Sequence, residues 1–275
     1  RPKAAALTSR GLLGGLAPLA LLPLVGGRHL RRGRDAVLAA LPLAHVMGLA
    51  VAFGALSAGV PWHHLRRFRA DDVLDRIERD HPNVFVGVPT MYADLEAAGA
   101  ARRDLTCIQL WISGADAMPP ERARRFQGFG AMGLLRGLPV GLAAFADGYG
   151  MVELSGPVAL KLYPPGLVRR LSPDLPHLVL PPTRVRAVGE HGPLGWFRKG
   201  ELQFRGARVL SGYRGVAGAG PGDDGWFGTG DHGRVLPGGL FQFAGRDGDR
   251  LKIGGFSVFP AEVEAALVQH PHVRE

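Results

Sequence analysis

The sequence predicts an α/β fold, in which a parallel sheet with flanking helices is followed by a β-barrel-like subdomain and the beginning of a small α+β C-terminal domain. Short apolar runs alternate with amphipathic runs up to about residue 156, which is typical of a parallel sheet covered by helices. Beyond that point, short strand-like runs lie between glycine-rich turns, which indicates an antiparallel unit. We therefore expect three units, at residues 1–156, 157–246 and 247–275.

The elements of the first unit follow from the apolar pattern. Three runs have the composition of buried strands: residues 36–43, 83–88 and 107–112. A further strand is expected to end near Phe145. Helices are expected over residues 45–59, from Asp71 or Asp72 to His81, and from Pro89 onward. Ligands bind at the carboxyl ends of parallel strands, so Pro89-Thr90 and Ser113-Gly114 mark the expected edge of a site.

The second unit contains four strand-like runs, at residues 185–188, 201–205, 233–236 and 240–243. Pro237-Gly238-Gly239 separates the last two and is a hairpin turn signal. From Asp247 a third unit begins, in which Pro260 opens a helix with Val263, Ala266 and Leu267 on one side. Because the chain stops soon after this start, we expect a fragment of a longer protein.

The charge balance is strongly basic, with 33 lysines and arginines against 24 acidic residues and a net charge of +9. Arginines form runs at residues 28–34, 63–69 and 122–125. Such runs fit either a nucleic-acid surface or a solvated face that attracts anionic cofactors. No aromatic interleaving or nucleic-acid motif accompanies them, so we expect the second and no nucleic-acid partner.

Composition also bears on the compartment. The apolar stretches at residues 11–27 and 36–62 are interrupted by proline and glycine, so we expect no transmembrane span, and no cleavage pattern indicates a signal peptide. The single Cys107 excludes an internal disulfide framework and fits a reducing compartment. A cytoplasmic protein is expected, while peripheral membrane contact and the oligomeric state stay open.

Two clusters combine glycines with acids. In residues 147–153 two glycines flank Tyr149, so a flat ligand can stack on the ring, and Glu153 can hold a divalent cation or a proton. In residues 225–231 glycines place Asp231 at a strand start with a free carboxylate, which can accept the two vicinal hydroxyls of a ribose. The structural alternatives are a glycine turn and an Asp-containing turn.

Two further clusters combine glycines or a loop with cations. Residues 245–255 hold cations suited to phosphates or hydroxyls and a glycine stretch that can act as a hinge, although a solvated linker has the same composition. At the start of the sequence, Lys3 in Arg1-Pro2-Lys3 can pair with phosphates.

Taken in order, the four clusters resemble the adenylate-forming superfamily of acyl-CoA synthetases, nonribosomal-peptide adenylation domains and luciferases, and the resemblance covers essentially the whole chain. The segments that carry it are Arg1-Pro2-Lys3, Leu41-Pro42-Leu43-Ala44-His45, Val88-Pro89-Thr90-Met91-Tyr92, Ser113-Gly114-Ala115, Tyr149-Gly150-Met151-Val152-Glu153, Gly200-Glu201-Leu202, Val209, Gly212-Tyr213, Thr229-Gly230-Asp231, Gly245-Arg246 and residues 252–264.

The resemblance implies a role for each matching position in the nucleotide site. The adenine pocket is implied for five residues: Gly114, Ala115, Asp147, Gly148 and Tyr149. Asp231 would bind the ribose hydroxyls with Arg246 beside it, and Lys3 would lie near the ATP phosphates. Glu153 would hold magnesium, within a nucleotide-contacting motif that also contains Gly150 and Val152.

The remaining roles concern the acid, coenzyme A and the hinge. His45 would shape the acyl tunnel, although a histidine in an apolar run is also typical of a hydrogen-bonded core residue. Arg67 sits where the family often places a cation for the CoA phosphate. Gly248 and Asp249 would form the hinge. Three residues of the small domain would face the nucleotide or CoA: Lys252, Gly255 and Phe256.

Several positions depart from the family pattern. Val152 stands where the family has threonine, and valine lacks the hydroxyl that contacts phosphate or magnesium-bound water. Asp116 and Ala117 replace a small residue and proline, Gly228 replaces a basic residue, and Gly248 at the pivot would loosen the hinge. The first part of the phosphate loop and the adenylation lysine fall outside residues 1–275, so we expect this chain alone to show little acid-dependent pyrophosphate exchange.

The resemblance implies an ATP-dependent, AMP-forming acid–thiol ligase. Its cofactors would be ATP/AMP, Mg²⁺ and coenzyme A, and its substrate a small-molecule carboxylic acid. The segment Val88–Tyr92 and the apolar helix after His45 suit an aliphatic chain, so a fatty acid is expected. The alternatives are an adenylating enzyme for aryl, dicarboxylic or amino acids, a non-catalytic adenylate-binding remnant, and, in another class, an arginine-rich nucleic-acid binder.

Overall fold

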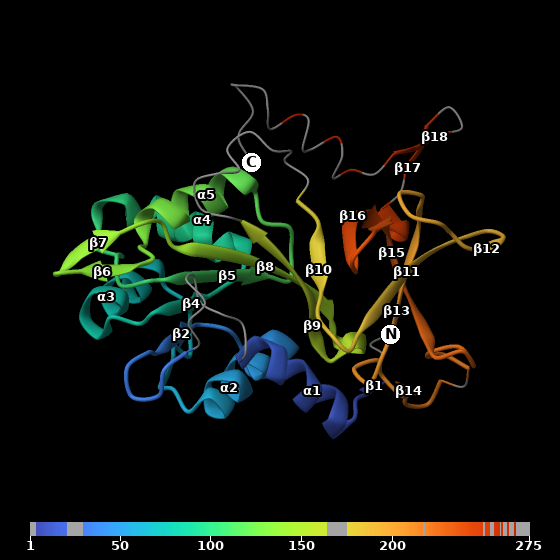
Figure 1. The fold of residues 1–275 in the computed structure, drawn as a ribbon, viewed down its shortest axis with the longest axis horizontal. Coiled ribbons are helices and arrows are strands. Elements are labelled where there is room, and N and C mark those ends of the chain that lie inside the picture. The colour runs from blue at the N-terminus through green and yellow to red at the C-terminus, as the bar shows by residue number, and fades with distance from the viewer. Residues whose placement is uncertain are drawn as a thin grey trace.

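The computed structural model describes residues 4–20, 30–163, 175–216, 218–249, 251–253 and 256–258, together with Pro260, Val263 and Leu267. Its centre is one twelve-stranded sheet (Figure 1). Five neighbouring strands at one end run parallel, in the order β3 (Trp62–His64), β2 (Val37–Ala39), β4 (Val84–Val86), β5 (Leu110–Gly114) and β8 (Ala144–Met151).

The remaining seven strands continue the same sheet and pair antiparallel. Their order is β9 (Gly156–Tyr163), β10 (His177–Val179), β16 (Leu240–Arg246), β15 (Trp226–Leu236), β13 (Lys199–Arg205), β11 (Arg184–Gly189) and β12 (Gly192–Pro193). The predicted change from a parallel to an antiparallel unit is therefore confirmed. The two units share one sheet across the β8–β9 pair, and the predicted domain boundaries stay a prediction.

Helices cover both faces of the parallel strands (Figure 1). On one face lie α3 (Ala70–Asp80), α4 (Pro89–Ala97) and α5 (Pro120–Phe129), whose buried side chains pack with Phe85 and Trp111 of the sheet. On the other face α2 (Val46–Ala58) packs on Val37, Val84 and Leu110, and α1 (Ser9–Ala20) lies against α2. Strands covered on both faces are apolar throughout, which is why β2 and β4 have no polar side chain.

Several short elements lie outside the central sheet and its covering helices. β1 (Ala5–Ala6) pairs with β14 (Gly212–Tyr213), which brings the start of the chain beside the antiparallel strands. The hairpin of β6 (Gly133–Leu135) and β7 (Leu138–Val140) extends from one end of the molecule. Three short helical turns are η1 (Ala100–Arg102), η2 (Val152–Leu154) and η3 (Asp247–Asp249), and β17 (Leu251–Ile253) pairs with β18 (Phe256–Val258).

The predicted fold class is confirmed, with two differences in detail. The strand that we expected to end near Phe145 continues to Met151, so residues 147–151 are strand. The β6–β7 hairpin was not expected, because its two strands are only three residues long. Of the helix predicted from Pro260, the structure describes Pro260, Val263 and Leu267, and Ala266 lies outside the described residues. Within the described part of the chain, no helix is both long and apolar enough to cross a bilayer.

Candidate active site

Two cavities open at the carboxyl ends of β5 and β8. The first has a volume of about 330 Å³ and lies between α2 and strands β2, β4 and β5. The second, of about 550 Å³, is bounded by residues of β14, β15 and η3. Met151, Glu153 and Arg246 line both cavities, so the two spaces meet at these three side chains.

The first cavity is lined mainly by aliphatic side chains and glycines. Its polar lining residues are His45, Ser113, Glu153 and Arg246, and the last two lie where the cavities meet. At the other end of α2, a Cβ added to Gly54 would meet nothing within 4 Å, so the backbone there faces open space. Since a helix rises about 1.5 Å per residue, Gly54 lies roughly 13 Å along the axis from His45. The cavity is therefore a deep apolar slot with a polar mouth.

His45 stands at the mouth because it caps α2. Its Nδ1 accepts a hydrogen bond from the backbone N–H of Met47 at 3.2 Å, and its own backbone is extended. A Cβ on Gly48 would lie 2.2 Å from the carbonyl oxygen of Pro42, so the first turn of α2 packs directly on the preceding segment. His45 lines the first cavity, and its predicted place at an acyl tunnel stays a prediction.

Backbone rather than side chains forms the edge beside β5 and β8. Gly114 pairs with Gly148, and a Cβ on Gly114 would lie 3.2 Å from both the carbonyl oxygen of Gly148 and the Cε of Met47. Ala115 follows with a left-handed φ of 72°. Gly114, Ala115, Gly148, Gly150 and Val152 all line the first cavity. The missing side chains leave a bare surface on which a flat group can lie.

Asp147 points away from this edge. Neither cavity is lined by it, its side chain is buried, and its Oδ1 has no hydrogen-bond partner within the described structure. Burial raises the pKa of Asp147 to about 6, against the opposing charge of Lys161. Its predicted place in the adenine pocket stays a prediction.

Asp231 is the centre of a buried polar group. Its Oδ2 accepts the hydroxyl of Tyr149 at 2.6 Å, and its Oδ1 accepts Nε of Arg246 at 3.0 Å. Only 1% of Asp231 is exposed. Burial, together with the negative charge of Asp231, raises the pKa of Tyr149 well above its usual value. The carboxylate that we expected to be free at a strand start instead lies in the middle of β15, is held on both oxygens and lines neither cavity. Each oxygen keeps one further lone pair for a hydroxyl donor, and the predicted ribose contact stays a prediction.

Tyr149 itself lines neither cavity. Its ring stacks on Phe204 at 5.6 Å and meets the edges of Phe241 and His177. These contacts come from the antiparallel part of the sheet, so the tyrosine joins the two halves of the molecule. The prediction that a flat ligand stacks on this ring stays a prediction.

Glu201 holds the part of β15 that precedes Asp231, and the sequence analysis assigned it no role. Its Oε1 accepts the N–H of Gly230 at 3.2 Å, and a Cβ on Gly228 would lie 2.5 Å from the same oxygen. Thr229 donates its hydroxyl to the carbonyl of Leu202 and accepts the N–H of Asp231. The sequence did contain two motifs that could have indicated this contact, Gly200-Glu201-Leu202 and Thr229-Gly230-Asp231. The two motifs lie side by side because β13 pairs with β15.

Glu153 lies in η2, immediately after β8. Its Oε1 accepts the hydroxyl of Tyr213 at 2.8 Å, and its backbone carbonyl accepts the N–H of Leu210. Burial and the neighbouring Glu153 raise the pKa of Tyr213 to about 12. Because β14 also pairs with β1, Glu153 lies close to the segment that follows Lys3. Lys3 itself lies outside the described residues.

Of the other predicted site residues, Arg67 lines neither cavity. Arg67 is exposed in the loop after β3, three strands from β5 in the sheet order. Lys252 and Phe256 lie on the β17–β18 hairpin, where Ile253 pairs with Phe256. Gly255 lies outside the described residues. Gly248 and Asp249 do line the second cavity, in η3.

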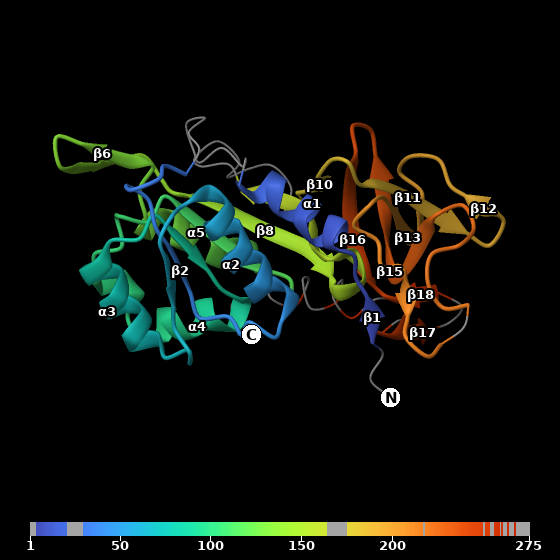
Figure 2. The ribbon, with the colours of Figure 1, turned by 90° about the horizontal axis from the view of Figure 1, so that it is seen from below.

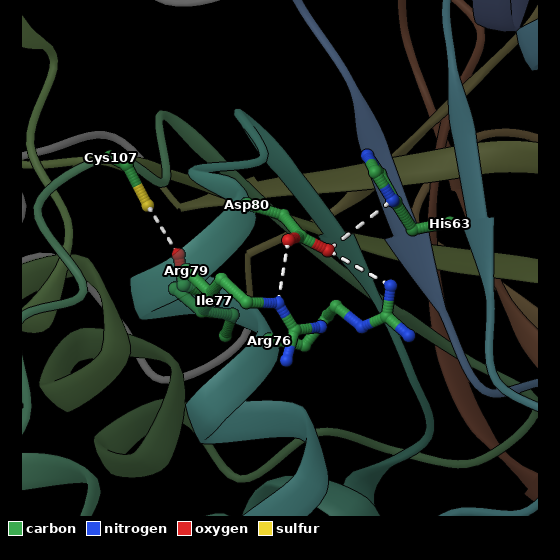
Figure 3. Close-up of polar contacts among 6 residues, drawn as sticks. All are labelled: His63, Arg76, Ile77, Arg79, Asp80 and Cys107. Carbon is green, nitrogen blue, oxygen red and sulfur yellow. Dashed lines mark hydrogen bonds and ion pairs between the residues drawn. The ribbon is translucent and has the colours of Figure 1, made fainter.

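Many arginines are paired with acids on the surface. Asp80 accepts Nη1 of Arg76 at 3.0 Å and Nε of Arg79 at 2.9 Å, and Nδ1 of His63 lies 3.5 Å away (Figure 3). The two arginines, the Arg79 hydrogen bond foremost, lower the pKa of Asp80. Glu96 likewise pairs with two arginines of α5. This local neutralisation agrees with a solvated face at these arginines.

Cys107 is a half-buried packing residue. Its thiol lies 3.7 Å from the carbonyl oxygen of Ile77 on α3, to which it donates (Figure 3). Burial raises the pKa of Cys107 to about 12, which keeps the thiol protonated at neutral pH.

The chain is similar to known proteins in sequence and in fold. Residues 1–214 match the profile of the family described as AMP-binding enzyme. A 2-succinylbenzoate–CoA ligase of Bacillus velezensis is 32% identical over 245 residues, which cover 88% of this chain and 47% of the relative. A long-chain-fatty-acid–CoA ligase of Bacillus subtilis is 30% identical over 251 residues, covering 89% and 42%.

Among solved structures, ATP-bound MatB from Rhodopseudomonas palustris superposes with a TM-score of 0.78 at 27% identity, over 100% of this chain and 51% of that one. The chain thus spans about half the length of the relatives that it matches.

Proposed function

Because the chain belongs to the AMP-binding enzyme family, we propose that its two cavities hold the two substrates of an adenylation reaction. The apolar cavity would take a carboxylic acid and the polar cavity a nucleotide. The observation that carries the proposal is that they meet at Glu153 and Arg246. A carboxylate at this junction would face the α-phosphate of ATP bound next to it.

The proposed reaction has two steps. An oxygen of the acid attacks the α-phosphorus, a new O–P bond forms, and the bond to pyrophosphate breaks to leave an acyl adenylate. The thiol of coenzyme A then attacks the acyl carbon, losing its proton, and AMP leaves. Both steps depend on positioning and charge neutralisation, which the residues around the junction would supply.

Individual residues have distinct tasks in this proposal. Asp231 would accept the ribose hydroxyls through its remaining lone pairs, while Arg246 would hold the carboxylate and face the phosphates. His45 would orient the acid at the mouth of the slot. Lys3, Lys252, Gly255 and Phe256 are assigned to phosphate and CoA contacts by the resemblance alone, as is Arg67.

Glu153 would hold a magnesium ion. The described residues contain no group of three or more His, Cys, Asp or Glu arranged for a metal, so a cation here would take a single carboxylate together with phosphate and water oxygens. Magnesium is commonly bound in this way beside nucleotide phosphates, where it neutralises developing charge. Val152 has no hydroxyl with which to contact the ion or its bound water.

We assign a fatty acid as the substrate, because the deep part of the first cavity is aliphatic. Within the described lining, the only arginine or lysine is Arg246, which lies at the mouth. A second carboxylate at the far end of an acid would therefore be buried without a partner, which is costly. This argues against a dicarboxylic acid, although four relatives are 2-succinylbenzoate–CoA ligases by name.

The test is calorimetric titration of the chain with non-hydrolysable acyl-adenylate analogues. An analogue with a long alkyl chain should bind more tightly than AMP and be displaced by ATP. Asp231→Asn and Glu153→Gln should weaken both AMP and the analogue. If the alkyl chain adds no affinity, the apolar cavity does not hold the acid; if AMP does not bind, the nucleotide assignment fails.

An adenylate-binding remnant is the second candidate, favoured by Val152 in place of threonine. It predicts the same binding without turnover. A version of the protein extended at both ends to the length of its relatives should form acyl-CoA if the ligase proposal holds.

A further inference from the structure

A surface outside both cavities combines exposed aromatic and basic side chains. In the connection between β12 and β13, Trp196 and Phe197 are 64% and 60% exposed, and Arg198 and Lys199 follow directly. Arg234 joins them because Lys199 pairs with it across β13 and β15. We call these five residues the aromatic–basic patch. None of them lines either cavity.

The backbone holds the patch in place at a conformational cost. Phe197 has a left-handed φ of 65°, which bulky residues rarely adopt. Its N–H donates to the carbonyl of Val235 at 2.9 Å, which anchors the strained residue to β15. Folding would be easier with glycine at this position. A strained backbone that holds a phenylalanine ring out in water indicates a task outside the folded chain.

The residue types identify the partner. Tryptophan favours the boundary between lipid headgroups and acyl chains, and phenylalanine inserts just below it. Arginine and lysine beside such rings are attracted to anionic headgroups. The whole chain is cationic, with a net charge of +9, which complements an anionic surface. Glu190, on the neighbouring β11–β12 turn, is an exposed acid near the patch.

We propose that the aromatic–basic patch docks the protein onto an anionic lipid bilayer. Trp196 and Phe197 enter the headgroup region, while Arg198, Lys199 and Arg234 contact the lipid phosphates. This inference does not depend on the proposed enzymatic function. The patch lies at the β12 end of the molecule, opposite the β6–β7 hairpin, as Figures 1 and 2 both show.

The hairpin supplies a matched control. Leu135 and Leu138 at its tip are 67% and 69% exposed, so they are as accessible as the aromatic pair. Arg136 is the one basic residue of the tip between them. Leu135→Ser/Leu138→Ser therefore removes exposed apolar surface without touching the patch. If binding were generic hydrophobic adsorption, this control would lose it as well.

The experiment is co-sedimentation of the 275-residue chain with two kinds of vesicle. One consists of phosphatidylcholine alone, and the other also contains about 30 mol% phosphatidylglycerol, which gives the surface a negative potential. We expect binding to the anionic vesicles only, weakened by salt. Trp196→Ala/Phe197→Ala should abolish it, and Arg198→Glu/Arg234→Glu should lower the partition coefficient by about tenfold or more. The hairpin control should bind like the unaltered chain.

Phe197→Gly separates a docking role from a folding role. Relief of the left-handed strain should raise Tm by about 2–4 °C, while vesicle binding falls several-fold. Equal binding to neutral vesicles, or binding lost in the hairpin control but kept in the patch variants, would overturn the proposal. So would absence of vesicle binding combined with patch-dependent binding to an acidic protein, which would assign the surface to a protein partner.

Discussion

Asp231 is held by side chains from two other strands, and at the scale of single residues this arrangement decides how the site responds to change. Tyr149 comes from β8, Arg246 from β16 and the carboxylate itself from β15. Because Asp231 is buried, each partner compensates part of the cost of removing a charge from water. The Asp231 carboxylate therefore contributes to the stability of the fold as well as to the candidate site.

Tyr149→Phe removes one of these partners while the ring keeps its contacts with Phe204 and Phe241. We expect the free energy of unfolding to fall by about 1–3 kcal/mol, since hydrogen bonds to charged groups contribute that much. AMP binding should weaken with it. Urea unfolding and calorimetric titration measure the two effects. Unchanged stability would mean that the 2.6 Å contact with Asp231 contributes nothing.

Glu201 acts on the site through backbone alone. Glu201→Ala leaves the N–H of Gly230 without its acceptor and loosens the part of β15 that precedes Asp231. We expect AMP affinity to fall several-fold with a loss of stability of about 1 kcal/mol. Glu201→Gln keeps an acceptor oxygen and should restore most of the affinity. A rescue that fails would show that the negative charge, rather than the hydrogen bond, is what matters.

At the scale of elements, α2 has two tasks, because it covers the sheet and forms one wall of the apolar cavity. Its sequence is apolar on all sides, so periodicity predicted a buried helix over residues 45–59 but could not indicate which side faces a cavity. Only packing shows that Gly54 borders empty space while Gly48 touches Pro42. The same holds for the short β6 and β7, whose pairing depends on a two-residue turn rather than on their own pattern.

Gly54→Leu tests the cavity wall. The added side chain would enter the open space beside Gly54, so a long-chain acyl-adenylate analogue should bind about tenfold more weakly or worse, while a short-chain analogue binds as before. Gly14→Leu on α1 is the control, since its Cβ also meets nothing and it lines neither cavity. Both changes replace a helical glycine and should stabilise by about 0.5–1 kcal/mol. Equal loss of long- and short-chain binding would contradict the placement of Gly54 at the deep end of the apolar cavity.

At the scale of the molecule, the ordered motifs predicted the family and the edge of the sheet where the site lies, because parallel strands bring their carboxyl ends together. They did not predict that β8 and β9 continue one sheet through both units, since the close approach of Gly150 to Gly156 is invisible in a pattern of apolar residues. A Cβ added at Gly150 would lie 2.2 Å from the carbonyl oxygen of Gly156. Nor did the motifs predict that Asp147 and Gly148 face opposite sides of the sheet. In a strand, alternate residues face opposite sides, so the register of β8 decides that Asp147 faces the core while Gly148 faces the cavity.

That orientation makes Asp147 one group through which pH acts on the stability of the fold. Its pKa is raised by burial to about 6, against about 3.9 in an unfolded chain, so the folded state binds the proton more tightly. The favourable contribution of the protonated form is complete below about pH 4 and is lost as pH rises through 6, which lowers stability by on the order of 2–3 kcal/mol at neutral pH. Asp147→Asn cannot ionise. We expect it to be more stable than the unaltered chain at pH 7.5, with the difference shrinking toward zero at pH 4, as urea unfolding at several pH values would show. A variant that is less stable at pH 7.5, or a difference independent of pH, would mean that the charged carboxylate has a partner at Oδ1 that offsets its burial.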